Sequence, residues 1–146
     1  MRPSGGMFRC RAFRCRRAVR YDTGMPFENS LALRVVRKHA DGVTVNFPLE
    51  PEFLNGNGVL HGGVIAAIAD EAAWHALVHA HKGHKEMTTT ELKVNYLRPI
   101  AGKKVVARAF VLRAGKTLSV TRVDLKDAEK RLSAIAIVTY MLLPAK

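Results

Sequence analysis

One uninterrupted helix-forming stretch, from Val64 to about His81, constrains the fold of this chain most strongly. It contains neither Gly nor Pro, and alanine recurs at positions 66, 67, 69, 72, 73 and 76. Alanine is the best helix former and has a very small side chain, so a sheet can approach such a helix closely. Bulkier apolar residues lie between the alanines, namely Val64, Ile65, Ile68, Leu77 and Val78. The pattern predicts one long, buried central helix.

The segments around this helix alternate in the manner of β-strands. Residues 31–38 and 43–49 flank an Asp41-Gly42 pair, which favours a tight hairpin turn. Four more strand-like segments follow the helix, at residues 88–97, 104–112, 117–125 and 132–143. Strands joined by short turns pair antiparallel. The expected order is β-β-α-β-β-β-β, an α+β fold with one antiparallel sheet around the helix, and the open sheet edges favour oligomerisation.

Length and charge indicate one domain preceded by a basic extension. A chain of 146 residues can bury its own core in a single domain. Half of the net charge of +12 comes from residues 1–24, which carry seven arginines and one acidic residue, Asp22. We expect a disordered extension at 1–24, whose Arg-rich composition is also typical of transit peptides, and a folded domain at 25–146. The cysteines, Cys10 and Cys15, lie in the extension and suit a reducing, cytoplasmic environment.

The composition also argues against two classes of partner. No apolar stretch reaches the roughly 18 residues that a membrane-spanning helix needs. The lysines and arginines of the domain are scattered, and no aromatic-basic motif for nucleic acid accompanies them. We therefore expect neither membrane insertion nor nucleic-acid binding.

The segment that leads into the helix carries the first candidate functional residues. Asn55 is followed, after five residues, by His61-Gly62-Gly63 at the helix start. The first N–H groups of a helix have no intrahelical acceptor and carry the positive end of its dipole, and glycine lets a substrate carbonyl approach closely. Gly62 and Gly63 are therefore candidate donors to a developing oxyanion, as acyl transfer requires. A tight loop-to-helix turn explains the two glycines equally well.

Asp70 lies about two turns into this otherwise apolar helix. A carboxylate on a core helix costs free energy unless it is hydrogen-bonded, partly solvated or used in chemistry. Its neighbour Glu71 points about 100° away, so at most one of the two faces the segment around Gly62, and Asp70 is the better candidate. An Asp-Glu pair on an exposed helix edge is the structural alternative.

Taken together, these residues resemble a known family. The pattern N-x5-HGG-x6-D, followed by a Thr-rich strand, VNYLRP and RAGKTLSV, is similar to hotdog thioesterases of the phenylacetic-acid-degradation type, relatives of 4-hydroxybenzoyl-CoA thioesterase. The similarity covers about residues 30–143. It implies a hotdog fold, cofactor-free hydrolysis of an acyl-CoA substrate, and a homo-oligomer, a dimer or dimer of dimers, with sites at the dimer interface. A hotdog protein that binds acyl-CoA or another small ligand without turnover is the alternative.

The resemblance also implies roles for individual residues. Gly62 would polarise the thioester carbonyl through its N–H, and Asp70 of the partner chain would act as general base or as nucleophile. Asn55 and His61 would help to hold the carbonyl and the attacking water. Thr89 would orient that water.

Two of the implied assignments have close alternatives. Strand alternation puts Thr88 and Thr90 on the face opposite Thr89, so a register slip of one residue would exchange the candidates. Trp74, one turn beyond Asp70, lies where one branch of the superfamily has a small hydroxyl residue. It could therefore line or shorten the acyl pocket, or it could simply pack in the core.

Further residues are candidates for holding the substrate. The turn at residues 114–117 includes Gly115 and Lys116 and matches a region that lies near the CoA nucleotide in relatives. Arg98 and Arg113 are further basic candidates for contacts to phosphate. A plain hairpin turn explains residues 114–117 equally well.

Four histidines near the end of the helix form the pattern of a candidate metal site: His75, His79, His81 and His84. Histidines four residues apart share a helix face, and imidazole is the commonest metal ligand. No HExxH motif and no matching carboxylate accompany them, and histidine also suits the negative end of a helix dipole. We expect no metal here.

Overall fold

The computed structural model describes residues 31–83 and 86–144. The expected basic extension at 1–24 lies outside the described residues, as does the start of the predicted domain. The strands and helices, in chain order, are β1 (Arg34–His39), β2 (Gly42–Pro48), the short 3-10 helix η1 (Pro51–Phe53), α2 (Gly62–Ala80), β3 (Met87–Tyr96), β4 (Lys104–Ala114), β5 (Leu118–Lys126) and β6 (Leu132–Leu142). The predicted order β-β-α-β-β-β-β is confirmed, with η1 as an addition within the loop before α2.

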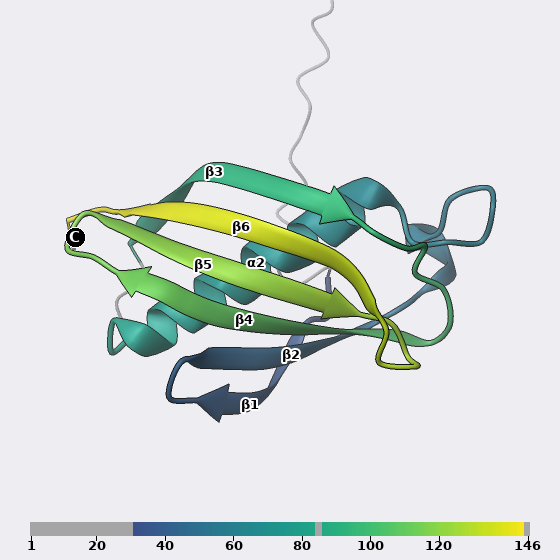
Figure 1. Ribbon diagram of the computed structural model, residues 1–146, viewed down its shortest axis with the longest axis horizontal. Coiled ribbons are helices and arrows are strands. Elements are labelled where there is room, and N and C mark those ends of the chain that lie inside the picture. Colours follow the sequence, from purple (N-terminus) through teal and green to yellow (C-terminus); the bar gives the residue numbers. More distant parts are fainter. Residues whose placement is uncertain (1–30, 84–85, 145–146) are drawn as a thin grey trace, which may run out of the picture.

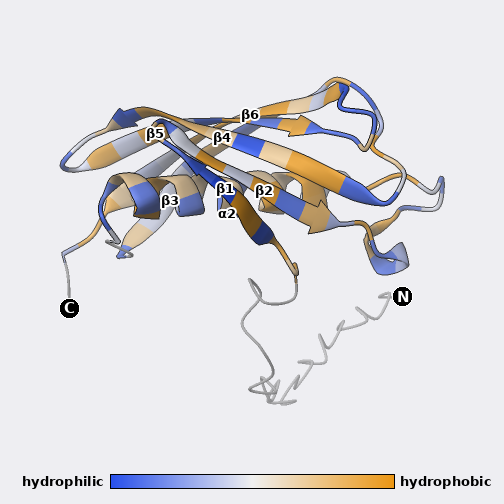
Figure 2. Ribbon diagram, turned by 90° about the horizontal axis from the view of Figure 1, so that it is seen from below, coloured by the Kyte–Doolittle hydropathy of each residue, from blue (hydrophilic) through white to orange (hydrophobic). Residues whose placement is uncertain are grey.

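The six strands form one antiparallel sheet in the order β1-β2-β4-β5-β6-β3. After β2 the chain crosses the sheet through α2 and resumes with β3 at the opposite edge, as Figure 1 shows. The sheet curves around α2, which lies along its inner face (Figures 1 and 2). This is the predicted hotdog fold.

The core lies between α2 and the inner face of the sheet. Alternate residues of the strands point inward, as with Val43, Val45 and Phe47 of β2, all of which are buried. The helix meets them with a row of buried small side chains, Ala69, Ala72, Ala73 and Ala76. The alternation gives the strands the banded hydropathy seen in Figure 2. In the part of the chain that the structure describes, no helix is long and apolar enough to cross a membrane.

Strand β3 is an edge strand with an irregularity in its pairing to β6. Thr89 pairs with Tyr140, but the next pair joins Glu91 to Thr139, so Thr90 is an extra residue in a β-bulge. All side chains of β3 are exposed or half-buried. Its outer edge carries backbone groups that no other described strand pairs with.

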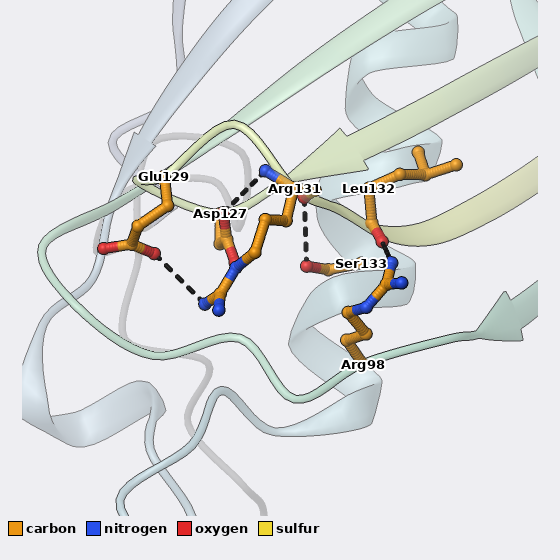
Figure 3. Close-up of polar contacts among 6 residues, drawn as sticks. All are labelled: Arg98, Asp127, Glu129, Arg131, Leu132 and Ser133. Carbon is orange, nitrogen blue, oxygen red and sulfur yellow. Dashed lines mark hydrogen bonds and ion pairs between the residues drawn. The ribbon is translucent and has the colours of Figure 1, made fainter.

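The turn between β5 and β6 is built on a buried carboxylate (Figure 3). Asp127 is 1% exposed and accepts hydrogen bonds from the backbone N–H of Arg131 at 2.9 Å and from its Nε at 2.7 Å. Burial by itself would raise the pKa of Asp127, but these bonds and the guanidinium charge outweigh it and hold that pKa below its usual value. The exposed Glu129 contacts the same guanidinium at 3.3 Å.

Candidate active site

Asp70 is held on α2 by two hydroxyl groups. Thr89 Oγ1 donates to the two carboxylate oxygens, at 3.0 and 3.2 Å. The hydroxyl of Tyr140 lies 2.7 Å from Asp70 Oδ1 and 3.0 Å from the Asp70 carbonyl oxygen. Burial, and then the Asp70 carboxylate, raise the pKa of Tyr140 well above its usual value, so the phenol stays protonated and donates. The carboxylate is thereby oriented by neutral donors rather than by a cation.

A cavity of about 600 Å³ opens in front of this carboxylate. Its apolar wall includes Leu33, Trp74 and Met87, and its polar lining includes Thr88 and Thr89. The volume falls within the range of roughly 300–1,000 Å³ that small-molecule sites occupy. The predicted residues Asp70, Thr89 and Trp74 therefore meet at one cavity.

The start of α2 presents a second cluster around Gly62. His61 is the N-cap residue, and its Nδ1 accepts a hydrogen bond from the Gly63 N–H at 3.3 Å. Among the residues that the structure describes, none accepts a hydrogen bond from the Gly62 N–H. Of the two glycines proposed as oxyanion donors, Gly62 has the available N–H, because that of Gly63 is taken by His61.

Tyr96 of β3 contacts the carbonyl side of Gly62. Its hydroxyl donates to the Gly62 carbonyl oxygen at 3.0 Å, and its ring lies 3.6 Å from the point where a Cβ on Gly62 would be. Gly62, Tyr96 and Arg98 line a depression of about 320 Å³. Arg98 donates from Nη1 to the Leu132 carbonyl at 2.8 Å (Figure 3), so its side chain is anchored beside this depression.

Asn55 organises the loop before the helix. Its Oδ1 accepts hydrogen bonds from the backbone N–H groups of Asn57 at 2.9 Å and Val59 at 3.3 Å. Its own N–H donates to the Val59 carbonyl at 2.8 Å. Asn55 thus closes a compact turn that leads the chain to His61.

The turn at residues 114–117 lies apart from both clusters. Only glycine fits at position 115, because a Cβ there would lie 2.2 Å from the Leu118 carbonyl oxygen. Ser119 Oγ accepts from the Gly115 N–H at 3.2 Å and lies 2.9 Å from His81 Nε2, which ties the turn to the end of α2. Arg113 and Lys116 are exposed and line neither the Asp70 cavity nor the Gly62 depression.

The structure does not bring Asp70 and Gly62 together within one chain. They lie on the same helix, eight residues apart, which corresponds to about 12 Å along the axis. Each faces its own cavity and its own partner from β3, Thr89 for Asp70 and Tyr96 for Gly62. Asp70 and Gly62 both face β3, in agreement with the prediction that Asp70 shares the helix face of the Gly62 segment, but the two are separated along the helix axis.

The histidines at the end of α2 have separate contacts. His79 Nε2 lies 3.1 Å from the His39 carbonyl oxygen, His81 contacts Ser119, and His75 packs edge-on against Trp74 with 5.0 Å between the ring centroids. His84 lies outside the described residues. Over residues 31–83 and 86–144, no three metal-ligating side chains converge.

Sequence reasoning missed both tyrosines of the site. A signal existed for Tyr140, because strand alternation places it on the buried face of β6 with Ala136 and Val138, where a hydroxyl needs a partner. Tyr96 lies within the quoted VNYLRP motif, but nothing in the motif shows that its hydroxyl meets a backbone carbonyl of the helix.

Comparison with known proteins places these features in a family. A sequence model described as "Thioesterase superfamily" matches residues 57–134, more than half of the chain. The chain is 33% identical over 133 residues to the medium/long-chain acyl-CoA thioesterase YigI of Escherichia coli K12, covering 81% of this chain and 86% of that protein. It is 34% identical over 103 residues to human acyl-coenzyme A thioesterase 13, covering 69% of this chain and 73% of that protein.

A solved structure agrees with this match. The crystal structure of a Shewanella oneidensis protein related to the thioesterase superfamily superposes with a TM-score of 0.70 at 31% identity, over 84% of this chain and 90% of that chain. Sequence and fold therefore agree that this chain belongs to the thioesterase superfamily.

Proposed function

We propose that this thioesterase hydrolyses acyl-CoA thioesters and that Asp70 and the Gly62 N–H perform the chemistry. The observation that carries the proposal is the Asp70 carboxylate, which is oriented by Thr89 and Tyr140 and opens onto a cavity of substrate size. The relatives named as acyl-CoA thioesterases support CoA as the thiol. The quoted sequence patterns favour the phenylacetic-acid-degradation branch, and the placement of the cysteines favours a cytoplasmic location.

The proposed reaction needs a base, a water molecule and an oxyanion donor. Asp70 takes a proton from water as the water oxygen attacks the thioester carbonyl carbon, and the Gly62 N–H donates to the resulting oxyanion. Collapse of this intermediate breaks the C–S bond, and the CoA thiolate leaves and recovers a proton. In the alternative course, an Asp70 oxygen attacks the carbonyl carbon, and water then hydrolyses the mixed anhydride. Thr89 and Tyr140 orient the same carboxylate in both courses.

The distance between the two groups implies a site shared by two chains. Reacting atoms must approach to about 3–3.5 Å, whereas Asp70 and Gly62 of one chain are separated by about 12 Å of helix. We propose that Gly62 of one protomer and Asp70 of its partner face one substrate. The outer edge of β3, which pairs with no other strand of the described residues, is the surface through which two sheets would join. Two such dimers could associate further into a tetramer.

The remaining predicted residues fit subsites around these two groups. Trp74 would contact the acyl group from within the Asp70 cavity, and Arg98 would lie near the CoA portion beside Gly62. His61, with Nδ1 engaged by the Gly63 N–H, keeps Nε2 available for the carbonyl or water. We propose that Arg113, Gly115 and Lys116 contact the CoA nucleotide, for which the exposed cations are suited by charge.

Release of free thiol from a panel of acyl-CoA thioesters tests the proposed function. The wild type is expected to release thiol, and Asp70→Asn is expected to lose at least a hundredfold in kcat, the contribution typical of a general base. Glu71→Gln is the matched control, because Glu71 is the next residue of the helix, and we expect it to keep turnover. Thermal unfolding of both variants checks that they fold.

Two results would contradict the proposal. Near-wild-type kcat for Asp70→Asn would exclude this carboxylate as the reacting group. Saturable binding of acyl-CoA without thiol release from any member of the panel would instead support a hotdog protein that binds its ligand without turnover.

A further inference from the structure

A second cavity lies further along α2, beyond the one that holds Asp70. It has a volume of about 280 Å³, and its apolar wall consists of Val35, Val43 and Val78. His75 lines both this distal cavity and the Asp70 cavity. Nothing in the reaction proposed above uses this space.

The residue that lines both cavities is one of a pair of aromatic side chains on α2. Trp74 packs edge-on against His75, with an interplanar angle of 73°. His75 is half-buried, and burial, followed by the nearby Lys38 ammonium, lowers the pKa of its imidazole. A neutral ring can line the path of an aliphatic chain without placing a charge beside it.

The positions along the helix give the order of these groups. From Asp70, the helix rises about 7.5 Å to His75 and about 12 Å to Val78. A short acyl group attached to a carbonyl at Asp70 would therefore end before His75. A longer unbranched chain would continue past His75 to the valines.

We propose that the distal cavity binds the far end of unbranched acyl chains, and that His75 and Val78 determine which chain lengths are accepted. This inference rests on the proposed thioester hydrolysis at Asp70. The exposed Lys38 and Lys82 also line the distal cavity, which keeps it close to solvent. Each methylene group that moves from water to an apolar wall favours binding about fourfold.

The test measures kcat/KM for dodecanoyl-CoA and butanoyl-CoA and uses their ratio as the readout. Val78→Phe fills the distal cavity, and excluding two or more methylene groups should lower the ratio at least tenfold, since each contributes about fourfold. His75→Ala removes the side chain shared by the two cavities and should raise the ratio at least twofold. Val36→Phe is the matched control, because Val36 is 52% exposed on β1 and lines neither cavity.

The outcomes separate this inference from the proposed function. A ratio within twofold of wild type in Val78→Phe, an equal fall in Val36→Phe, or an unchanged or lower ratio in His75→Ala would each overturn the chain-length assignment while hydrolysis stands. No thiol release from either substrate by a wild type that hydrolyses other members of the acyl-CoA panel would overturn the chain-length assignment alone, and no release from any member would overturn both. If thermal unfolding shows that Val78→Phe does not fold, Val78→Leu replaces it, with an expected fall of about fourfold.

Discussion

Gly62 occupies the first position of α2, which makes its N–H open to a selective test. Proline is tolerated at this position, because the N–H there has no intrahelical acceptor, and His61 already has the extended backbone that a residue before proline adopts. Gly62→Pro should therefore fold but lose the proposed oxyanion donor. We expect kcat to fall by about a hundredfold or more, measured by thiol release.

Gly62→Ala is the control for that substitution. It keeps the N–H, and its Cβ would lie at an ordinary contact distance of 3.6 Å from the Tyr96 ring. Activity close to wild type in Gly62→Ala, together with the loss in Gly62→Pro, is the expected pair of results. Equal activity in the two variants would rule out the Gly62 N–H as the donor.

The three consecutive threonines of β3 offer a second test. Thr89→Val removes a hydroxyl that donates to Asp70, and kcat should fall about tenfold, since a hydrogen bond to a charged group contributes about 1.5 kcal/mol or more. Thr90→Val removes a hydroxyl that donates to the Thr139 carbonyl on the neighbouring strand and should leave kcat unchanged. A larger loss in Thr90→Val than in Thr89→Val would contradict this arrangement.

Single residues show how much of the candidate site could be predicted from the sequence. The cost of placing a carboxylate on an apolar helix singled out Asp70, and the family resemblance selected Thr89 among three consecutive threonines, of which Thr88 also lines the Asp70 cavity. The hydroxyls of Tyr140 and Tyr96 could not be assigned, because each meets a group of the helix that is distant in sequence, Asp70 and the Gly62 carbonyl respectively. Local pattern says which way a side chain points from its strand, not what lies opposite.

At the scale of elements, the β5–β6 turn predicts a dependence of stability on pH. The lowered pKa of Asp127 means that the folded state binds its proton less tightly than the unfolded state. The stabilisation that results from this difference is fully present above the pKa of Asp127 in the unfolded chain. It is lost as the pH falls through the pKa of Asp127 in the folded protein. Asp127→Asn should therefore have a lower Tm than wild type at pH 7, and the difference should narrow below about pH 4.

Glu129→Gln provides the comparison for Asp127→Asn. Glu129 contacts the same Arg131, but both partners are exposed, and exposed ion pairs contribute little. Thermal unfolding followed by circular dichroism across this pH range should show almost no change in Tm for Glu129→Gln. A difference between wild type and Asp127→Asn that stayed constant with pH would show that the charge of Asp127 is not responsible.

The elements themselves were largely foreseeable, and their arrangement less so. The Asp41-Gly42 turn, the Ala-rich helix and four later strands follow from local composition, because turn chemistry and side-chain period act over a few residues. Pattern alone does not reveal that β3 crosses to the far edge and pairs with β6. That pairing depends on contacts between residues that are roughly forty to fifty-five positions apart, which no local pattern specifies.

At the scale of the whole molecule, a shared site predicts complementation between two inactive chains. Asp70→Asn and Gly62→Pro protomers, produced together, should form mixed dimers in which one of the two sites has both groups intact. With random pairing, roughly a quarter of the wild-type site content should reappear as activity, since half of the dimers are mixed and each has one working site.

Each variant expressed alone is the control and should stay inactive. Light scattering should show at least a dimer for the wild type and both variants. A fully active monomer, or a mixture no more active than its two components, would refute the shared site. In either case Asp70 and Gly62 would have to act without each other.

The bulge at Thr90 must be kept in any attempt to rebuild this site on another protein. Tyr96 follows Thr89 by seven residues, and in a strictly alternating strand an odd separation puts two side chains on opposite faces. The extra residue restores parity, so that one strand reaches both Asp70 and Gly62 of the same helix. Deleting Thr90 should leave a sheet that still folds but can satisfy only one of these contacts. A design that reproduces the site on another scaffold must therefore keep the number of residues between Thr89 and Tyr96 as well as the identities of the site residues.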